Sequence, residues 1–188
     1  MNKLNKIIRL LTIPPIMAAA LFLILGVYGI LSPIDSALGI LFIAVLPVLS
    51  YPLQPIIPYF KDRGREGQRN LAIVFSVVGY VLGCILALIF NAPINTVVFI
   101  YLDYLLSGIL IAVFNKAFHL KASGHACGIV GPVAMLLYYG LYLPAAIGAV
   151  LVIPVFISSI MMKRHTFLQL LGGSAITVSA LLFLMIFF

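Results

Sequence analysis

The stretch LAIVFSVVGYVLGCILALIF, residues 71–90, contains no charged side chain. About 20 apolar residues in a helix span the hydrocarbon core of a bilayer, whereas a transmembrane β-strand needs only about 10. Backbone groups inside a bilayer must be hydrogen-bonded within a helix or a closed barrel. The stretch therefore predicts a transmembrane helix, and its length argues against a barrel strand.

Similar apolar stretches occur on both sides of it. Of the 188 residues, 64% are hydrophobic and 8% are charged. In soluble domains about half of the residues are apolar and about a quarter are charged. We expect an all-α protein, a polytopic transmembrane helix bundle of about six to seven spans that forms a single integral membrane domain over residues 1–188. The further apolar segments are residues 8–31, 36–59, 94–114, 123–141, 144–162 and 166–188.

Proline residues mark the expected ends and interruptions of these segments. Each proline removes a helix hydrogen bond and favours a kink or a stop. Pro14 and Pro15 predict an interruption of the first segment. The second segment is expected to end irregularly, because three prolines recur near its end: Pro52, Pro55 and Pro58.

The basic residues fall into four groups, and two predicted spans separate each group from the next. All four groups therefore lie on the same membrane face. An excess of lysine and arginine favours the cytoplasmic side, although residues that bind a substrate phosphate would also cluster, wherever the site faces. The groups are Lys3, Lys6 and Arg9; Lys61, Arg63, Arg65 and Arg69; Lys116 and Lys121; and Lys163 and Arg164.

The net charge of +7 raises the question of a nucleic-acid partner. The basic residues lie in short groups between apolar segments, not along an exposed face with aromatic platforms. We therefore expect the partners to be the lipid bilayer and a lipid phosphate, and no nucleic acid.

Three connections on the shared face carry most of the unusual polar side chains. They are KDRGREGQRN at 61–70, HLKASGHA at 119–126 and KRHTFLQ at 163–169. Ionisable residues beside hydrocarbon are costly and usually face a bundle interior or a water-filled cavity. The three loops are therefore expected to converge on one pocket.

Two histidines stand at expected helix starts in these loops. Ser123 is placed to cap the helix that follows it, where free N–H groups favour an anion near His125. Gln169 lies four residues after His165, on the same helical face, and is expected to orient its imidazole. An ordinary positive-inside loop with structural histidines remains the alternative interpretation.

Two histidines flanked by cations favour phosphoryl transfer. One neutral histidine would attack phosphorus and the other would protonate the leaving oxygen, while arginines and lysines hold the non-bridging oxygens. This chemistry requires no metal and no cofactor.

In order and spacing, the three loops resemble the type 2 phosphatidic acid phosphatase superfamily. These membrane enzymes carry a lysine with a downstream arginine, then Ser-Gly-His, then an arginine and a histidine followed four residues later by aspartate. Residues 122–125 match the second motif without its usual proline, and His165 with Gln169 matches part of the third. The resemblance covers residues 61–188 as a phosphatase-like core, with two N-terminal spans in residues 1–60 as an extension.

The resemblance implies a role for each matched residue. His165 would be the nucleophile that forms a phosphohistidine, His125 the general acid, and Gln169 the orienting residue. The implied phosphate-binding residues are Lys61, Arg63, Arg69, Lys121, Ser123, Gly124 and Arg164.

The sequence also departs from the family pattern at four positions. Lys61 stands eight residues before Arg69 where the family has seven, and Asn70 replaces a proline. Ser159 occupies the place of the third-motif arginine, and Gln169 replaces the aspartate. These departures bear on turnover, because an amide cannot stabilise a protonated histidine as a carboxylate does.

The sequence-based hypothesis is a membrane-embedded lipid-phosphate phosphatase acting on a phosphatidate-like or polyprenyl (di)phosphate substrate. The alternatives are a catalytically inactive lipid-phosphate binder or transporter, and a structural subunit. One further polar residue, Asp103, lies mid-span between Tyr101 and Tyr104, where insertion costs about 2.5–3.5 kcal/mol. A hydrogen bond to a neighbouring tyrosine is expected there.

Overall fold

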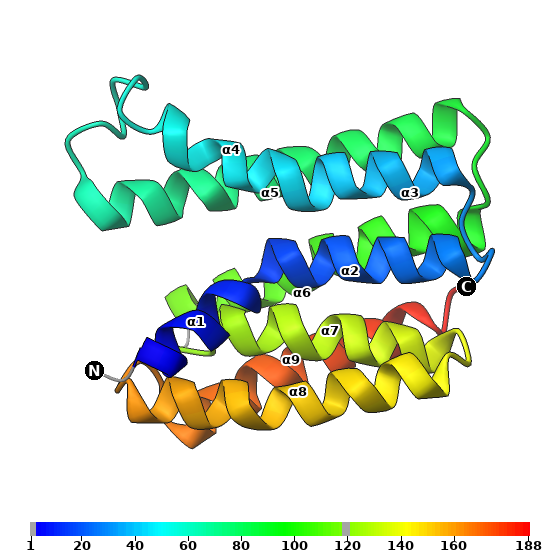
Figure 1. Cartoon of the computed structure of the whole chain (residues 1–188). Helices are drawn as coiled ribbons and strands as arrows, with labels where there is room; N and C mark the ends of the chain where they lie inside the picture. Colours follow the sequence, from blue (N-terminus) through cyan, green and yellow to red (C-terminus); the bar gives the residue numbers. More distant parts are fainter. Residues whose placement is uncertain (1–2, 118–120) are drawn as a thin grey trace.

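The computed structural model describes residues 3–117 and 121–188, and within these ranges every regular element is a helix (Figure 1). This confirms the all-α prediction. The elements are α1 (Lys3–Leu11), α2 (Pro14–Val27), α3 (Pro33–Gly39), η1 (Ile40–Val45), α4 (Leu46–Leu53), α5 (Gly64–Ile89), η2 (Ile94–Val98), α6 (Phe99–Ala117), α7 (Gly124–Tyr138), α8 (Tyr142–Met161) and α9 (Phe167–Leu184).

In the described ranges, five helical stretches are long and apolar enough to cross a membrane: Pro33–Leu53, Gly64–Ile89, Ile94–Ala117, Tyr142–Met161 and Phe167–Leu184. The bent pair α1 and α2 makes a sixth candidate. The 15 residues of α7 are apolar but fewer than in the other spans. Large apolar side chains on the outside suit lipid better than water; Val27 is 84% exposed and Leu168 77% exposed. The chain therefore has the architecture of a multi-pass membrane protein.

Prolines set the breaks in the first two spans. α1 and α2 meet at 49°, and Ile13 is extended because it precedes Pro14, the first residue of α2. The π-helical turn η1 comes directly before α4, near whose start Pro47 lies. A wider turn accommodates a ring that lacks an N–H and would clash with the preceding turn.

The second span begins and ends earlier than predicted. It runs over Pro33–Leu53, not over 36–59, because prolines at 55 and 58 cannot continue the helical hydrogen bonds. Ser32 begins it by accepting a hydrogen bond from the Asp35 N–H.

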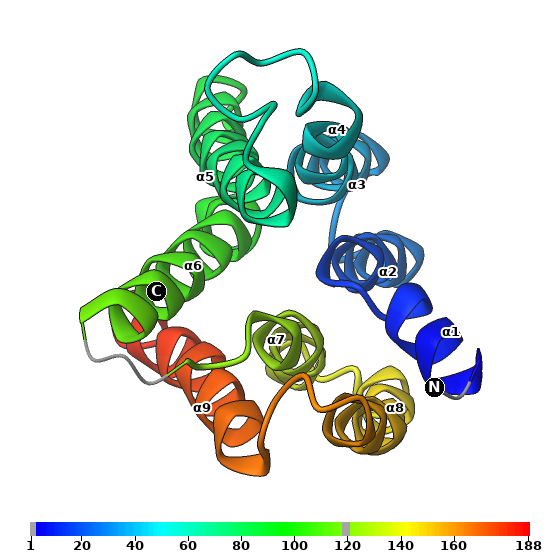
Figure 2. The same cartoon turned by 90° about the vertical axis from the view of Figure 1, so that its left-hand side faces the viewer.

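The helices run side by side, so the connections between them lie at two opposite ends of the bundle (Figure 1). The N-terminus, the α4–α5 connection, the start of α7 and the α8–α9 connection lie at one end, and the C-terminus lies at the other. We call the first of these the basic end, because the connections there carry the basic groups. Seen from this end, α7 lies beside α2, α8 and α9 (Figure 2), and α1 packs on α8.

The expected partner of Asp103 is not found. Asp103 is buried in α6, and neither its Oδ1 atom nor the hydroxyl of Tyr104 has a hydrogen-bond partner among the described residues. The prediction of a tyrosine hydrogen bond was therefore wrong for this pair. Tyr104 instead packs against Tyr80, with ring centroids 5.8 Å apart.

Candidate functional site

The second and third polar loops are joined by a backbone hydrogen bond. The Ser123 N–H donates to the carbonyl oxygen of Gln169 at 2.9 Å. This contact requires Gly173, one turn further along α9, because an added Cβ there would lie 2.1 Å from the Ser123 carbonyl oxygen. The start of α7 is therefore docked directly onto the first turn of α9.

The predicted cap of α7 is present. The hydroxyl oxygen of Ser123 accepts a hydrogen bond from the Ala126 N–H at 3.3 Å, and the Ser123 side chain is fully buried. The Ser123 hydroxyl therefore caps the start of α7. Gly124 is exposed, and a Cβ added to it would meet nothing within 4 Å.

His165 precedes α9, and Gln169 fixes its tautomer. Oε1 of Gln169 accepts a hydrogen bond from the Thr166 N–H at 3.2 Å, which establishes that the amide oxygen, not its nitrogen, faces this side. The same oxygen lies 3.3 Å from Nδ1 of His165. Because a carbonyl oxygen only accepts, Nδ1 must carry the hydrogen. The neutral ring therefore keeps a lone pair on Nε2.

His125, the second residue of α7, contacts the N-terminal segment. Its Nε2 lies 3.3 Å from Oγ1 of Thr12. The Thr12 hydroxyl donates its one hydrogen to the carbonyl oxygen of Ile8 at 2.7 Å, so it can only accept from His125. Nε2 of His125 therefore carries the hydrogen, and Nδ1 is the nitrogen left to exchange a proton.

Arg9, which the sequence prediction did not select, joins α1 to the end of α8. Its Nη1 donates to Oγ of Ser159 at 3.1 Å, and Ser159 is fully buried near the end of α8. Arg9 is within electrostatic range of His125, His165 and Arg164. The signal available in the sequence was the three-residue spacing of Arg9 and Thr12, which puts both on one helical face.

A tight turn after α8 carries Arg164 and His165 toward this cluster. The Lys163 N–H donates to the Ile160 carbonyl at 2.9 Å and the Arg164 N–H to the Ser159 carbonyl at 3.0 Å. This pair of bonds usually has glycine at the left-handed position, but here Lys163 adopts it with φ of 52°. Arg164 is exposed beside the cluster, and Lys121, also left-handed with φ of 47°, is exposed before α7.

The first polar loop does not join this cluster, which corrects the prediction that three loops converge. Nε2 of Gln54 donates to the carbonyl oxygens of Phe60 and Gly64 at 3.0 and 3.1 Å. These bonds tie the 54–63 connection to the start of its own helix. The guanidinium of Arg63 stacks 3.9 Å above the Tyr59 ring.

The helix that follows the first loop also packs elsewhere. The main neighbours of α5 are α4, α6, η1 and η2, none of which carries His125 or His165. Lys61, Arg63 and Arg69 are exposed at the basic end. The stretch 119–126 is described only from residue 121, because residues 118–120 lie outside the described ranges.

The environment of His165 favours its neutral form. Burial lowers the pKa of His165 below its ordinary value of 6.5, the charges of Arg9 and Arg164 lower it further, and the Gln169 hydrogen bond raises it in part. His165 is therefore neutral at pH 7, with its Nε2 lone pair free.

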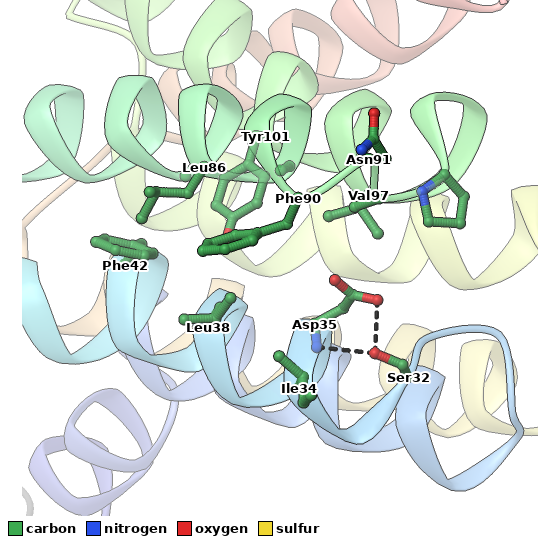
Figure 3. Close-up of a pocket in the computed structure, with 14 residues that line it drawn as sticks. Ser32, Ile34, Asp35, Leu38, Phe42, Leu86, Phe90, Asn91, Val97 and Tyr101 are labelled. Carbon is green, nitrogen blue, oxygen red and sulfur yellow. Dashed lines mark hydrogen bonds between the residues drawn. The ribbon is translucent and has the colours of Figure 1, made fainter.

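A cavity lies at the other end of the bundle. It has a volume of about 450 Å³ and lies between α3 on one side and α5 with η2 on the other (Figure 3). Its lining is mainly apolar, including Leu38, Phe42 and Phe90. The nearest carboxylate, Asp35, already accepts a hydrogen bond from the Ser32 hydroxyl at 2.6 Å. This cavity suits an apolar group and is separate from the histidine cluster.

The cluster of Arg9, Thr12, His125, Ser159 and His165 is named here the two-histidine site. It combines a free imidazole lone pair, a second imidazole and a half-buried guanidinium, which are groups suited to an anion with a leaving oxygen. Comparisons of the chain with protein-family models, with curated proteins and with solved structures find no match. The function is therefore argued from the chemistry of the site.

Proposed function

We propose that this protein is a membrane-embedded lipid-phosphate phosphatase that acts through a phosphohistidine. The observation that carries the proposal is the arrangement of the two histidines. They come from different loops, and they lie within electrostatic range of each other and of Arg9. The hydrogen bond from Nδ1 of His165 to Gln169 leaves the lone pair of His165 on Nε2.

The proposed reaction has two steps. Burial and the charges of Arg9 and His165 lower the pKa of His125 to about 4, so in this proposal His125 takes up a proton on Nδ1 as the anionic phosphate binds beside it. In the first step, Nε2 of His165 attacks phosphorus; the P–N bond forms, the P–O bond to the lipid alcohol breaks, and His125 returns that proton from Nδ1 to the leaving oxygen. In the second, water attacks the phosphohistidine, its proton passes to His125, and the P–N bond breaks to release inorganic phosphate. Both histidines return to their starting states.

The position of the site supports a lipid substrate. It lies at the basic end of a bundle whose outer surface is apolar, so a phosphate head group can meet the histidines while its tail stays in the bilayer. A phosphatidate-like or polyprenyl (di)phosphate substrate has this shape. The basic groups at the same end would draw anionic lipids toward it. By the positive-inside bias, we propose that this end faces the cytoplasm.

A binder or transporter of lipid phosphate that does not turn over is the second candidate. Two observations favour it: the exposed Arg69 stands apart from the two-histidine site, and residue 169 offers an amide where the resembled enzymes have a carboxylate. Transport sites usually lie near the midplane of the bilayer, whereas the two-histidine site lies at an end of the bundle. This difference favours the phosphatase.

Phosphate release by the purified chain tests the proposal. The substrates are phosphatidate, phosphatidylglycerophosphate and polyprenyl phosphates in detergent micelles, without added metal. We expect release from at least one lipid at a rate that rises with the amount of protein. Binding of these lipids without any release would reject the phosphatase and leave the binder.

The pH dependence of this release is expected to reflect the lowered pKa of His165. The nucleophile must be neutral. Because its pKa lies below 6.5, His165 stays active as the pH falls through 6.5. The acid side of the rate profile, where the rate falls with falling pH, should therefore have its midpoint below 6.5. Gln169→Leu removes the contact that raises this pKa. The variant should therefore shift the acid side to still lower pH, and should lower the maximal rate because the tautomer is no longer fixed.

The measurement is the rate of release between pH 4 and pH 8 for the native chain and Gln169→Leu. An acid side centred above 6.5, or one that Gln169→Leu moves upward, would contradict the assignment of His165 as the neutral nucleophile.

A further inference from the structure

We infer that Arg9, which α1 contributes from outside the phosphatase-like core, is the arginine that binds the phosphate group at the two-histidine site. This deepens the proposed function and rests on it for the nature of the reaction. Binding of phosphate by Arg9 can nevertheless be measured when no reaction occurs.

The charges of the cluster call for an anion. Arg9 is partly buried and lies within electrostatic range of both histidines and of Arg164, and Arg164 lies within range of His165. The acidic residues of the whole chain are Asp35, Asp62, Glu66 and Asp103. None of them belongs to α1, α7, α8, α9 or the connections between α6 and α9. The positive charge is therefore not neutralised from within these elements.

The guanidinium of Arg9 is held by one hydrogen bond and has other N–H donors available for a ligand. An arginine has five N–H donors in a planar fork that matches two oxygens of a phosphate. The bond from Nη1 to Ser159 uses one of them, and no other hydrogen bond of its side chain is found among the described residues. Ser159 is fully buried in α8, and its bond to Nη1 sets the direction of the guanidinium.

The helix start beside Arg9 supplies further donors. In the first turn of α7, the Ala126 N–H is taken by Ser123 Oγ and the Cys127 N–H by the Ser123 carbonyl. The N–H groups of Gly124 and His125 precede these and have no partner within the helix. A phosphate beside Arg9 and His125 would meet them, with the favourable end of the helix dipole.

Ser159 of α8 holds an arginine that comes from a different helix, α1. The two residues are 150 positions apart in the sequence. The N-terminal segment is therefore part of the site, although the sequence predicted it to be an extension.

Binding of inorganic phosphate to the purified full chain tests the inference, by calorimetric titration of the native chain, Arg9→Gln and Lys3→Gln. Lys3→Gln is the matched control, because it removes an equal charge from an exposed position of the same helix. Loss of a charged, partly buried hydrogen-bonding group is expected to weaken phosphate binding by about tenfold or more. Lys3→Gln should stay within about twofold of the native chain.

Two more variants keep the test sharp if Arg9→Gln unfolds. Arg9→Lys keeps the charge without the fork and should recover part of the lost affinity. Ser159→Ala leaves Arg9 intact but undirected and should weaken binding less than Arg9→Gln. A short-chain phosphatidate titrated in parallel distinguishes the sources of the anion: tighter binding than free phosphate indicates a lipid head group, and equal binding indicates free phosphate.

Phosphate affinity that is unchanged in Arg9→Gln and Arg9→Lys, or lost instead in Arg69→Gln, would overturn the inference. A native chain that binds no phosphate would also overturn it. A native chain that binds phosphate through Arg9 but hydrolyses no lipid would reject the phosphatase proposal and leave this inference standing.

Discussion

His165→Ala is expected to reduce phosphate release by about 10³-fold or more, because loss of a nucleophile removes the covalent route and leaves only binding and charge stabilisation. The fold should survive, since His165 is only half-buried and, among the residues that the structure describes, its side chain makes one hydrogen bond, to Gln169. Release is measured at saturating lipid, and thermal unfolding of the same samples reports the fold.

Phe167→Ala provides the matched control for this variant. Phe167 is two residues away, at the start of α9, and is 56% exposed with no place in the two-histidine site. It should keep a rate within about twofold of the native chain. A His165→Ala protein that folds normally and releases phosphate at the native rate would remove His165 from the mechanism.

Gly173→Ala is expected to cause the largest structural effect of any single methyl group near the site. The added Cβ would lie 2.1 Å from the carbonyl oxygen of Ser123, and a backbone atom cannot rotate away. Overpacking of this kind costs about 1–3 kcal/mol or more. Here it would also separate the Ser123 N–H from the Gln169 carbonyl, so activity should fall together with stability.

Gly172→Ala is the comparison for that effect, because it lies next in the chain on the same helix. Its Cβ would lie 3.8 Å from the Cβ of Ala122, an ordinary contact. Alanine is also preferred to glycine inside a helix by about 1 kcal/mol. Thermal unfolding in detergent should therefore show a loss for Gly173→Ala and no loss for Gly172→Ala; equal behaviour of the two would contradict the docking of α7 on α9.

The sequence was sufficient for features that depend on local pattern. The apolar length of residues 71–90 predicts a span, the prolines at 14 and 55 predict the breaks, and Ser123 predicts a helix cap. The four-residue spacing of His165 and Gln169 likewise predicted their contact. Each of these depends on residues close together in the chain, where periodicity and capping rules apply.

The site itself could be predicted only in part, because its remaining contacts are between distant segments. The Arg9–Ser159 bond spans 150 positions, and the local spacing of Arg9 and Thr12 does not reveal that Ser159 is the partner. The placement of the 54–63 connection depends on Gln54, whose amide bonds tie that loop to α5. Basic residues on one membrane face can therefore belong to separate surfaces.

Trapping of labelled phosphate on the protein tests the central claim most directly. The native chain is mixed with a lipid phosphate carrying ³²P, quenched in base, which preserves a phosphohistidine, and digested to locate the label. Label is expected on the peptide that contains His165, none is expected in His165→Ala, and acid should remove the label. Phosphate release without label on any histidine, or label that stays in His165→Ala, would contradict a phosphohistidine at His165.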